Sequence, residues 1–243
     1  MNGENNGYRS SAFPETRWTL IEDVRAGGDR GKRALEELCQ LYWFPVYAYV
    51  RRSGAQHVDA EDLTQGFFER LLRRGDLGNA EAERGRLRSF LLTSLKHYTF
   101  AVHRKERALR RGGGVVTVPM DAEKRFEREV IDGDNPETLF ERRWAHGVLE
   151  ETIVRLESSY GDMGQRDLFN EIRRYLMAGR ERSAGGYAGA AERLEMSTGA
   201  VKVAVHRMRA RWGEALRETV AETVSNGEEV ESELHHILRV LGG

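Results

Sequence analysis

Apolar side chains recur at intervals of three or four residues along almost the whole of this 243-residue chain. That interval places them on one face of an α-helix. Only four prolines occur in the chain, so long helices are allowed. Pro45 is expected to kink the helix in which it lies. The sequence therefore predicts an all-α fold.

The apolar spacing also predicts where the helices lie. It indicates helices at 32–52, 58–72, 87–109, 167–177 and 187–220, a short one from Thr16, and one that Pro136 opens. Three glycines at 112–114 interrupt the pattern. Residues 115–118 form either a short strand or an extended linker, and a linker is favoured because no partner strand is indicated.

This pattern predicts two helical domains, at 14–111 and 136–221, joined by a flexible acidic linker at 112–135. A disordered N-terminal tail is expected at 1–13. An acidic C-terminal extension with a short helix is expected at 222–243.

Composition and spacing exclude several classes of protein. A single cysteine, Cys39, excludes an internal disulfide framework and cysteine-based zinc sites, and its apolar neighbours predict a buried, inert thiol. The glycine of a phosphate-binding loop is missing before Gly31 and Lys32, and no histidines have ligand spacing, so neither an enzyme nor a cofactor is expected. No apolar run reaches the ~18 residues of a membrane span, and the polar N-terminus is not a secretory signal. A soluble, cytoplasmic protein without a membrane partner is expected.

Charge is gathered in blocks, although the whole chain has a formal net charge of only −1. Nine bases and one acid give residues 84–111 a charge of +8, whereas residues 121–141 carry −5 and residues 214–233 carry −6. A solvated helix face normally mixes both signs. A block of one sign therefore indicates contact with a polyanion such as nucleic acid. Among these bases, Phe90 is expected in the core, and Tyr98 or Phe100 could stack on an unpaired base.

Residues 187–211 predict a helix-turn-helix. In the first helix, at 187–194, the small Ala190 and Ala191 allow a second helix to cross closely. Ser197 or Thr198 is expected to cap the second helix by accepting a hydrogen bond from an N–H of its first turn. Glycine is usual in such a turn, but this chain has Glu195, and a positive φ there costs roughly 1 kcal/mol. Either the turn differs or the domain tolerates the strain.

The second helix has two faces of opposite character. Its buried stripe is expected to consist of Val201, Val205, Met208 and Trp212. Its other face carries bases, which suits a helix inserted in the major groove of DNA. An ordinary helical hairpin with a basic face is the alternative.

Taken in order, these segments resemble a bacterial RNA polymerase sigma factor of the extracytoplasmic-function type. The resemblance covers about residues 16–221 and is sharpest in the ten residues from Asp59 to Phe68, which resemble the family's core-polymerase-binding helix. Residues 84–111 resemble the segments that melt and read the −10 promoter element, and residues 187–211 the unit that reads the −35 element. The resemblance implies a protein that binds core RNA polymerase and directs promoter recognition and transcription initiation.

The resemblance also implies roles for individual residues. Core polymerase would be contacted by Asp59, Asp62, Leu63, Gln65 and Phe68. The −10 DNA would be contacted by Arg88, Lys96, His97, Arg104 and Arg107. The −35 DNA would be contacted by Thr198, Lys202, His206, Arg207 and Arg209. Helical spacing alone favours the core for Leu63 and Phe67. Core RNA polymerase and promoter DNA are the implied partners, and an anti-sigma factor is left open.

The chain departs from the family pattern at two places, which suggests a subgroup with its own regulation. Residues 156–182 are longer than usual, lack a Leu-Pro opening and carry extra glycines, and residues 222–243 end in an apolar helix that minimal members do not need. The extension either folds back over Lys202 and Arg209 and lowers DNA binding, or it solubilises the chain and packs its apolar end on the second domain. The rival function is a helix-turn-helix DNA-binding regulator that does not act as a polymerase subunit.

Overall fold

In the computed structural model, the described residues are 20, 23, 24, 26–72, 86–109, 135–176 and 186–242. They are almost entirely helical and contain no strand, only an isolated antiparallel bridge between Arg86 and Val224. The all-α expectation is therefore confirmed for this part of the chain. The predicted N-terminal tail, the glycine triplet and nearly all of the predicted linker lie outside the described residues.

The helices follow the predicted order closely. Their bounds are α2 Gly28–Arg52, α3 His57–Leu72, α4 Leu87–Leu109, α6 Pro136–Asp162, α7 Arg166–Ile172, α8 Gly186–Arg193, α9 Thr198–Ala221 and α10 Val230–Gly242. Two short 3₁₀ turns, η2 at Arg173–Tyr175 and η3 at Gly227–Glu229, complete the order. The buried Pro45 lies inside α2, which continues past it to Arg52. At the start of α6, the Asn135 side chain accepts from the backbone N–H of Thr138, and Pro136 occupies the first turn, where its missing N–H costs nothing.

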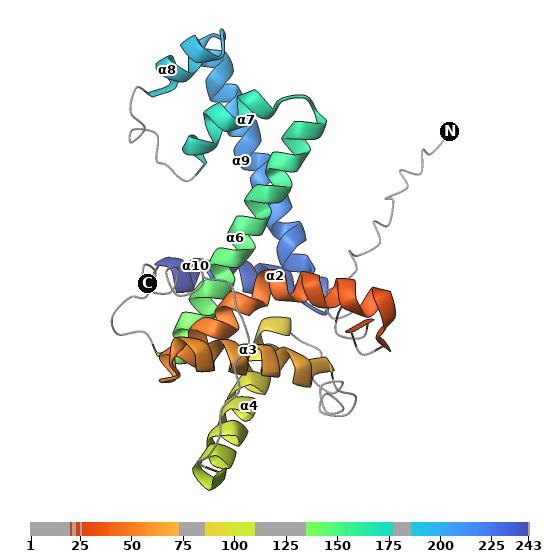
Figure 1. The fold of residues 1–243 in the computed structure, drawn as a ribbon. Coiled ribbons are helices and arrows are strands. Elements are labelled where there is room, and N and C mark those ends of the chain that lie inside the picture. The colour runs from red at the N-terminus through yellow and green to blue at the C-terminus, as the bar shows by residue number, and fades with distance from the viewer. Residues whose placement is uncertain are drawn as a thin grey trace, which may run out of the picture.

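Two long helices, α6 and α9, run as a pair through the molecule (Figure 1). Around one end of this pair lie α2, α3, α4 and α10, and around the other lie α7 and α8. The far part of α4 projects away from the other helices. Because α6 and α9 each reach both groups, these two helices connect the helix-turn-helix of α8 and α9 to the larger group.

The buried residues form two hydrophobic cores. The larger core joins α2, α3, α4 and α10 to one end of the α6–α9 pair, where Trp144 and Val220 are fully buried. The smaller core holds α7, α8 and the first half of α9 against the other end of α6, where Leu156 and Tyr160 are buried. Each core buries enough large apolar side chains to hold its helices together.

These cores divide differently from the predicted domains at 14–111 and 136–221. The first half of α6 and the end of α9 belong to the larger core, and only the segment between them forms the smaller one. The reason is that apolar residues continue along the whole length of α6, so both of its ends are buried. The C-terminal extension likewise packs on the larger core, through Ile237 and its apolar neighbours. None of the described helices combines the length with the apolar character that a membrane span requires.

Candidate nucleic-acid interface

The turn between α8 and α9 has the geometry of a helix-turn-helix. Ala190 and Ala191 are buried where α8 meets α9. The backbone N–H of Met196 donates to the carbonyl of Ala191 over 2.9 Å, and that of Glu195 donates to Glu192 over 3.2 Å. These two bonds are those of a Schellman ending, in which one residue adopts the left-handed conformation.

Glu195 is that left-handed residue, with φ of 52°. Among the described residues it alone has a positive φ without being glycine. The turn therefore has the usual backbone shape and accepts the strain of a side chain there. Two residues further on, the Ser197 hydroxyl accepts from the N–H of Ala200 over 3.1 Å. This identifies Ser197, of the two predicted candidates, as the cap of α9.

The two predicted faces of α9 are both present. Val201, Val205 and Met208 are buried in the smaller core, and Trp212 is half-buried against it. The opposite side is exposed at Thr198, Lys202, His206 and Arg207. Four of the five residues predicted to face the −35 element are thus available at the surface.

Arg209, the fifth residue of this set, is placed differently. It is half-buried, and its guanidinium donates two hydrogen bonds, of 2.6 Å and 3.2 Å, to the backbone carbonyl of Tyr175. Arg209 also lines a hollow of about 370 Å³ beside Tyr187, Lys202 and His206. The structure therefore gives it a role in joining α9 to the segment after α7.

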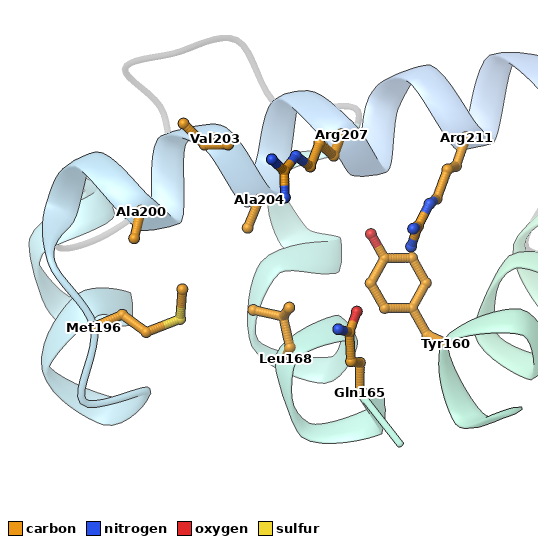
Figure 2. A pocket seen from close by; sticks show the side chains of 9 residues that line it. All are labelled: Tyr160, Gln165, Leu168, Met196, Ala200, Val203, Ala204, Arg207 and Arg211. Carbon is orange, nitrogen blue, oxygen red and sulfur yellow. The ribbon is translucent and has the colours of Figure 1, made fainter. Parts of the chain in front are cut away.

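A second hollow, of about 400 Å³, lies between α9 and the α6–α7 corner (Figure 2). Leu168, Met196 and Ala200 form its apolar end, and Arg207 and Arg211 stand at the other. The guanidinium of Arg211 lies 5.2 Å from the centre of the Tyr160 ring, a cation–π contact. Basic side chains of α9 therefore also line this second hollow, together with apolar residues.

A second cationic surface lies on α4, between Lys96 and Arg104. Lys96, His97 and Arg104 are exposed there, and Phe100 has 71% of its surface exposed. Lys96 pairs with Glu137 over 3.0 Å, and this contact lowers the pKa of Glu137. Arg107 lies on α4, but its side chain is outside the described residues. An exposed aromatic ring among bases suits stacking on an unpaired base.

Tyr98, the other aromatic candidate for stacking, packs against α3. Its ring centre lies 5.8 Å from that of Phe67. The guanidinium carbon of Arg70 lies 5.9 Å from the centre of the same Tyr98 ring. Gly66 lets the Tyr98 hydroxyl approach the α3 backbone, at a place where a Cβ would collide with it. Phe100 is therefore the exposed ring of the two, while Phe90 is half-buried against the larger core as expected.

Arg88, predicted to meet the −10 element, is 3% exposed. Its Nε and Nη2 donate to the two carboxylate oxygens of Glu233 over 2.8 Å and 3.0 Å, and its Nη1 donates to Glu141 over 2.5 Å. Its guanidinium also lies 5.1 Å from the centre of the Trp144 ring. Burial disfavours the charged form, but the hydrogen bonds and charges of the two carboxylates outweigh it and raise the pKa of Arg88. In this arrangement Arg88 does not reach the surface.

Sequence reasoning missed the partners of Arg88. Glu233 is fully buried on α10, and Arg86 reaches the same carboxylate over 3.2 Å. His236 lies 3.3 Å from Glu141, and its pKa is lowered because burial and the charge of Arg88 outweigh the attraction of the carboxylates. The available signal was Glu233 itself, a charged residue within the apolar stripe of the C-terminal helix.

The outer side of α3 carries part of the predicted polymerase-binding set. Asp59 and Gln65 are exposed, Asp62 is half-buried, and Gln65 donates to Glu69 over 3.1 Å. Leu63 is half-buried and packs on the larger core. Phe68 is 4% exposed and lies within that core, so its ring is not at the surface. The three polar residues thus form the accessible part of this set.

The acidic extension does not lie over the exposed face of α9. Glu222 pairs with Arg155, Glu231 with Arg217 near the end of α9, and Glu233 with the two arginines that precede and begin α4. Lys202 remains exposed. The extension therefore covers the start of α4 rather than the exposed bases of α9.

Cys39 is half-buried, and burial raises the pKa of its thiol to about 11. Among the described side chains, no group of three or more His, Cys, Asp or Glu residues is arranged to hold a metal ion. No protein-family model, curated protein or solved structure matches the chain.

Proposed function

We propose that this chain is a sigma factor, a subunit that binds core RNA polymerase and directs it to promoters. The observation that carries the proposal is that one chain presents two separate cationic helices, α9 in a helix-turn-helix and the projecting part of α4 with its exposed Phe100. A regulator that reads only duplex DNA needs the first of these and has no use for an exposed ring that stacks on unpaired bases.

The roles divide between the two surfaces. Thr198, Lys202 and His206 lie on the exposed side of α9, where a helix in the major groove presents its side chains to base edges and phosphates. Lys96, His97, Arg104 and Phe100 lie on α4, where bases and a ring together suit single-stranded DNA. Both α4 and α9 pack against α6, so one protein would hold two stretches of the same promoter.

The third surface is the polar side of α3. Asp59, Asp62 and Gln65 offer acidic and amide groups that a basic surface of core polymerase would pair with. This assignment rests on the resemblance of residues 59–68 to the family's polymerase-binding helix and on the exposure of Asp59 and Gln65.

Gel filtration with purified core RNA polymerase tests the proposal. The wild-type chain should elute with polymerase as a one-to-one complex, and Asp62→Asn should weaken that complex. Asp167→Asn is the matched control, because it removes the same charge from an exposed position on α7. Failure of the wild-type chain to elute with polymerase would overturn the proposal. Tight binding to a duplex operator in the absence of polymerase would then support the rival regulator.

A further inference from the structure

The C-terminal helix α10 places a carboxylate where the basic block of the chain begins. Glu233 accepts from Nε and Nη2 of Arg88 over 2.8 Å and 3.0 Å, and its Oε2 lies 3.2 Å from Nε of Arg86. A carboxylate held by two guanidinium groups has the charge and fork geometry with which arginines also hold a phosphate. Glu233 therefore binds these two arginines in the way that a phosphate of nucleic acid would.

The chain just before α10 is fastened to the same place. The backbone N–H of Leu87, the first residue of α4, donates to the carbonyl of Thr223 over 3.0 Å. Arg86 bridges to Val224, and its Nη2 donates to the Ser232 hydroxyl over 2.6 Å. The two ends of the segment from residue 223 to residue 233 thus both contact the start of α4.

Glu233 and a phosphate of nucleic acid cannot bind the same guanidinium nitrogens of Arg88 at the same time. Glu233 is fully buried, and a buried carboxylate is stable only while charged partners compensate for its lost hydration. If a phosphate takes the guanidinium of Arg88, Glu233 must return to water, and α10 must leave with it. Binding of α10 and binding of an anion at Arg88 are therefore linked with opposite sign.

The size and position of α10 suit such a displacement. It has 13 residues and is attached to α9 through a short connection that contains η3. Ile237 is buried, but Val230, Leu234, Val240 and Leu241 are only partly buried. A helix of this length is marginal alone, so α10 depends on its contacts with the rest of the chain.

We propose that α10 is an intramolecular inhibitor of nucleic-acid binding by α4, in which Glu233 withholds Arg88 and Arg86 until the helix is displaced. The inference rests on the proposed function, in that α4 must be a DNA-contacting element. In the closed form the chain presents Lys96, His97 and Arg104 but keeps back the two arginines at the start of the helix. Displacement of α10 makes these two arginines available as further contacts for nucleic acid.

The first test compares two variants of the full chain that each remove one negative charge from α10. Glu233→Gln weakens the hold on Arg88 while keeping the shape of the side chain. Glu231→Gln is the control, because Glu231 is exposed and pairs with Arg217 on α9. Affinity for a fluorescent single-stranded oligonucleotide is measured by anisotropy over a range of salt concentrations.

Glu233→Gln should raise affinity by about 5- to 100-fold, the usual size of coupling between two sites, and Glu231→Gln should have little effect. Each released arginine that meets a phosphate should also steepen the slope of log affinity against log salt by about 0.7 for a single strand, which gives about 1.4 if both do and Arg88 leaves Glu141 as well. The double variant Arg88→Gln, Glu233→Gln should lose most of the gain. Equal affinities for the two single variants, or a gain that survives the loss of Arg88, would overturn the inference.

The second test needs no substitution and so does not depend on whether Glu233→Gln folds. Hydrogen exchange of the α10 amides is measured in the wild-type chain with and without the oligonucleotide. Linkage requires that DNA which takes Arg88 speeds exchange in residues 230–242. Unchanged or slowed exchange there, at saturating DNA, would contradict the inhibitor role.

These outcomes are separate from the fate of the proposed function. A chain that fails to bind core polymerase but shows both DNA effects would keep the inhibitor and lose the sigma assignment. A chain that binds polymerase but shows neither DNA effect would keep the assignment and lose the inhibitor.

Discussion

The guanidinium of Arg155, on α6, donates two hydrogen bonds to the carboxylate of Glu222, just beyond the end of α9. The distances are 2.5 Å and 2.6 Å, and Arg155 also donates to Glu151 over 2.7 Å. Hydrogen bonding to Glu222 raises the pKa of Arg155 and outweighs the effect of its burial. This contact fixes the two long helices to one another near the place where the larger core meets the smaller one.

Substitution of Glu222 tests how much that contact contributes to stability. Glu222→Gln should lower the free energy of unfolding by about 1–2 kcal/mol, because a pair of opposite charges becomes a partly solvated hydrogen bond between the guanidinium and a neutral amide. Glu218→Gln, at an exposed position on α9, should change that free energy by less than about 0.5 kcal/mol. Urea unfolding followed by circular dichroism provides the comparison. Equal midpoints for the two variants would show that the pair contributes little.

The close approach of Tyr98 to Gly66 leads to a second prediction. Alanine at an interior helix position is usually better than glycine by about 1 kcal/mol. Here the Cβ of Gly66→Ala would collide with the Tyr98 hydroxyl, so the variant should be less stable than the wild type. Tyr98→Phe removes the oxygen, and in that background Gly66→Ala should recover stability. Thermal unfolding of the four chains measures the coupling, and purely additive effects would contradict it.

The strained turn between α8 and α9 predicts a stabilising substitution. Glu195 has φ of 52°, a conformation that glycine adopts without the clash of a Cβ. Glu195→Gly should therefore raise the free energy of unfolding by about 0.5–1 kcal/mol. Glu192→Gly is the control, because it removes the same side chain from an exposed position inside α8 and should destabilise by about 1 kcal/mol. Destabilisation by both substitutions would show that the left-handed turn is not strained.

The thiol of Cys39 should react slowly at neutral pH. Burial raises its pKa to about 11, so the reactive thiolate is scarce until the pH approaches that value. Reaction with an aromatic disulfide reagent should be slow in the folded chain at pH 8 and fast in denaturant, where the thiol regains its ordinary pKa. Equal rates in the two conditions would contradict the effect of burial.

Local features of the fold were accessible from the sequence because their causes are local. The bounds of α4 match the apolar spacing at 87–109, Ser197 caps α9, and Glu195 occupies the position where the turn requires a left-handed residue. Each follows from the residues within one or two helical turns. The exposed bases on α9 follow from the same spacing, since buried and exposed sides alternate with the period of the helix.

Features that depend on distant contacts were not predictable in this way. The family resemblance of the basic block implies that Arg88 contacts DNA, but its partner Glu233 is 145 residues further along the chain. The resemblance implies that Phe68 contacts core polymerase, but its ring is buried beside Phe67 because α3 packs against α2 and α4. The division into domains at residue 136 overlooked α6, whose apolar residues serve both cores and show no break in composition.

Run-off transcription from a pooled promoter library with purified core RNA polymerase tests the central claim most directly. The claim predicts that adding this chain yields transcripts from a subset of templates that share two spaced sequence elements, and that Lys202→Ala reduces their yield. Transcripts no different from those of core polymerase alone would contradict it.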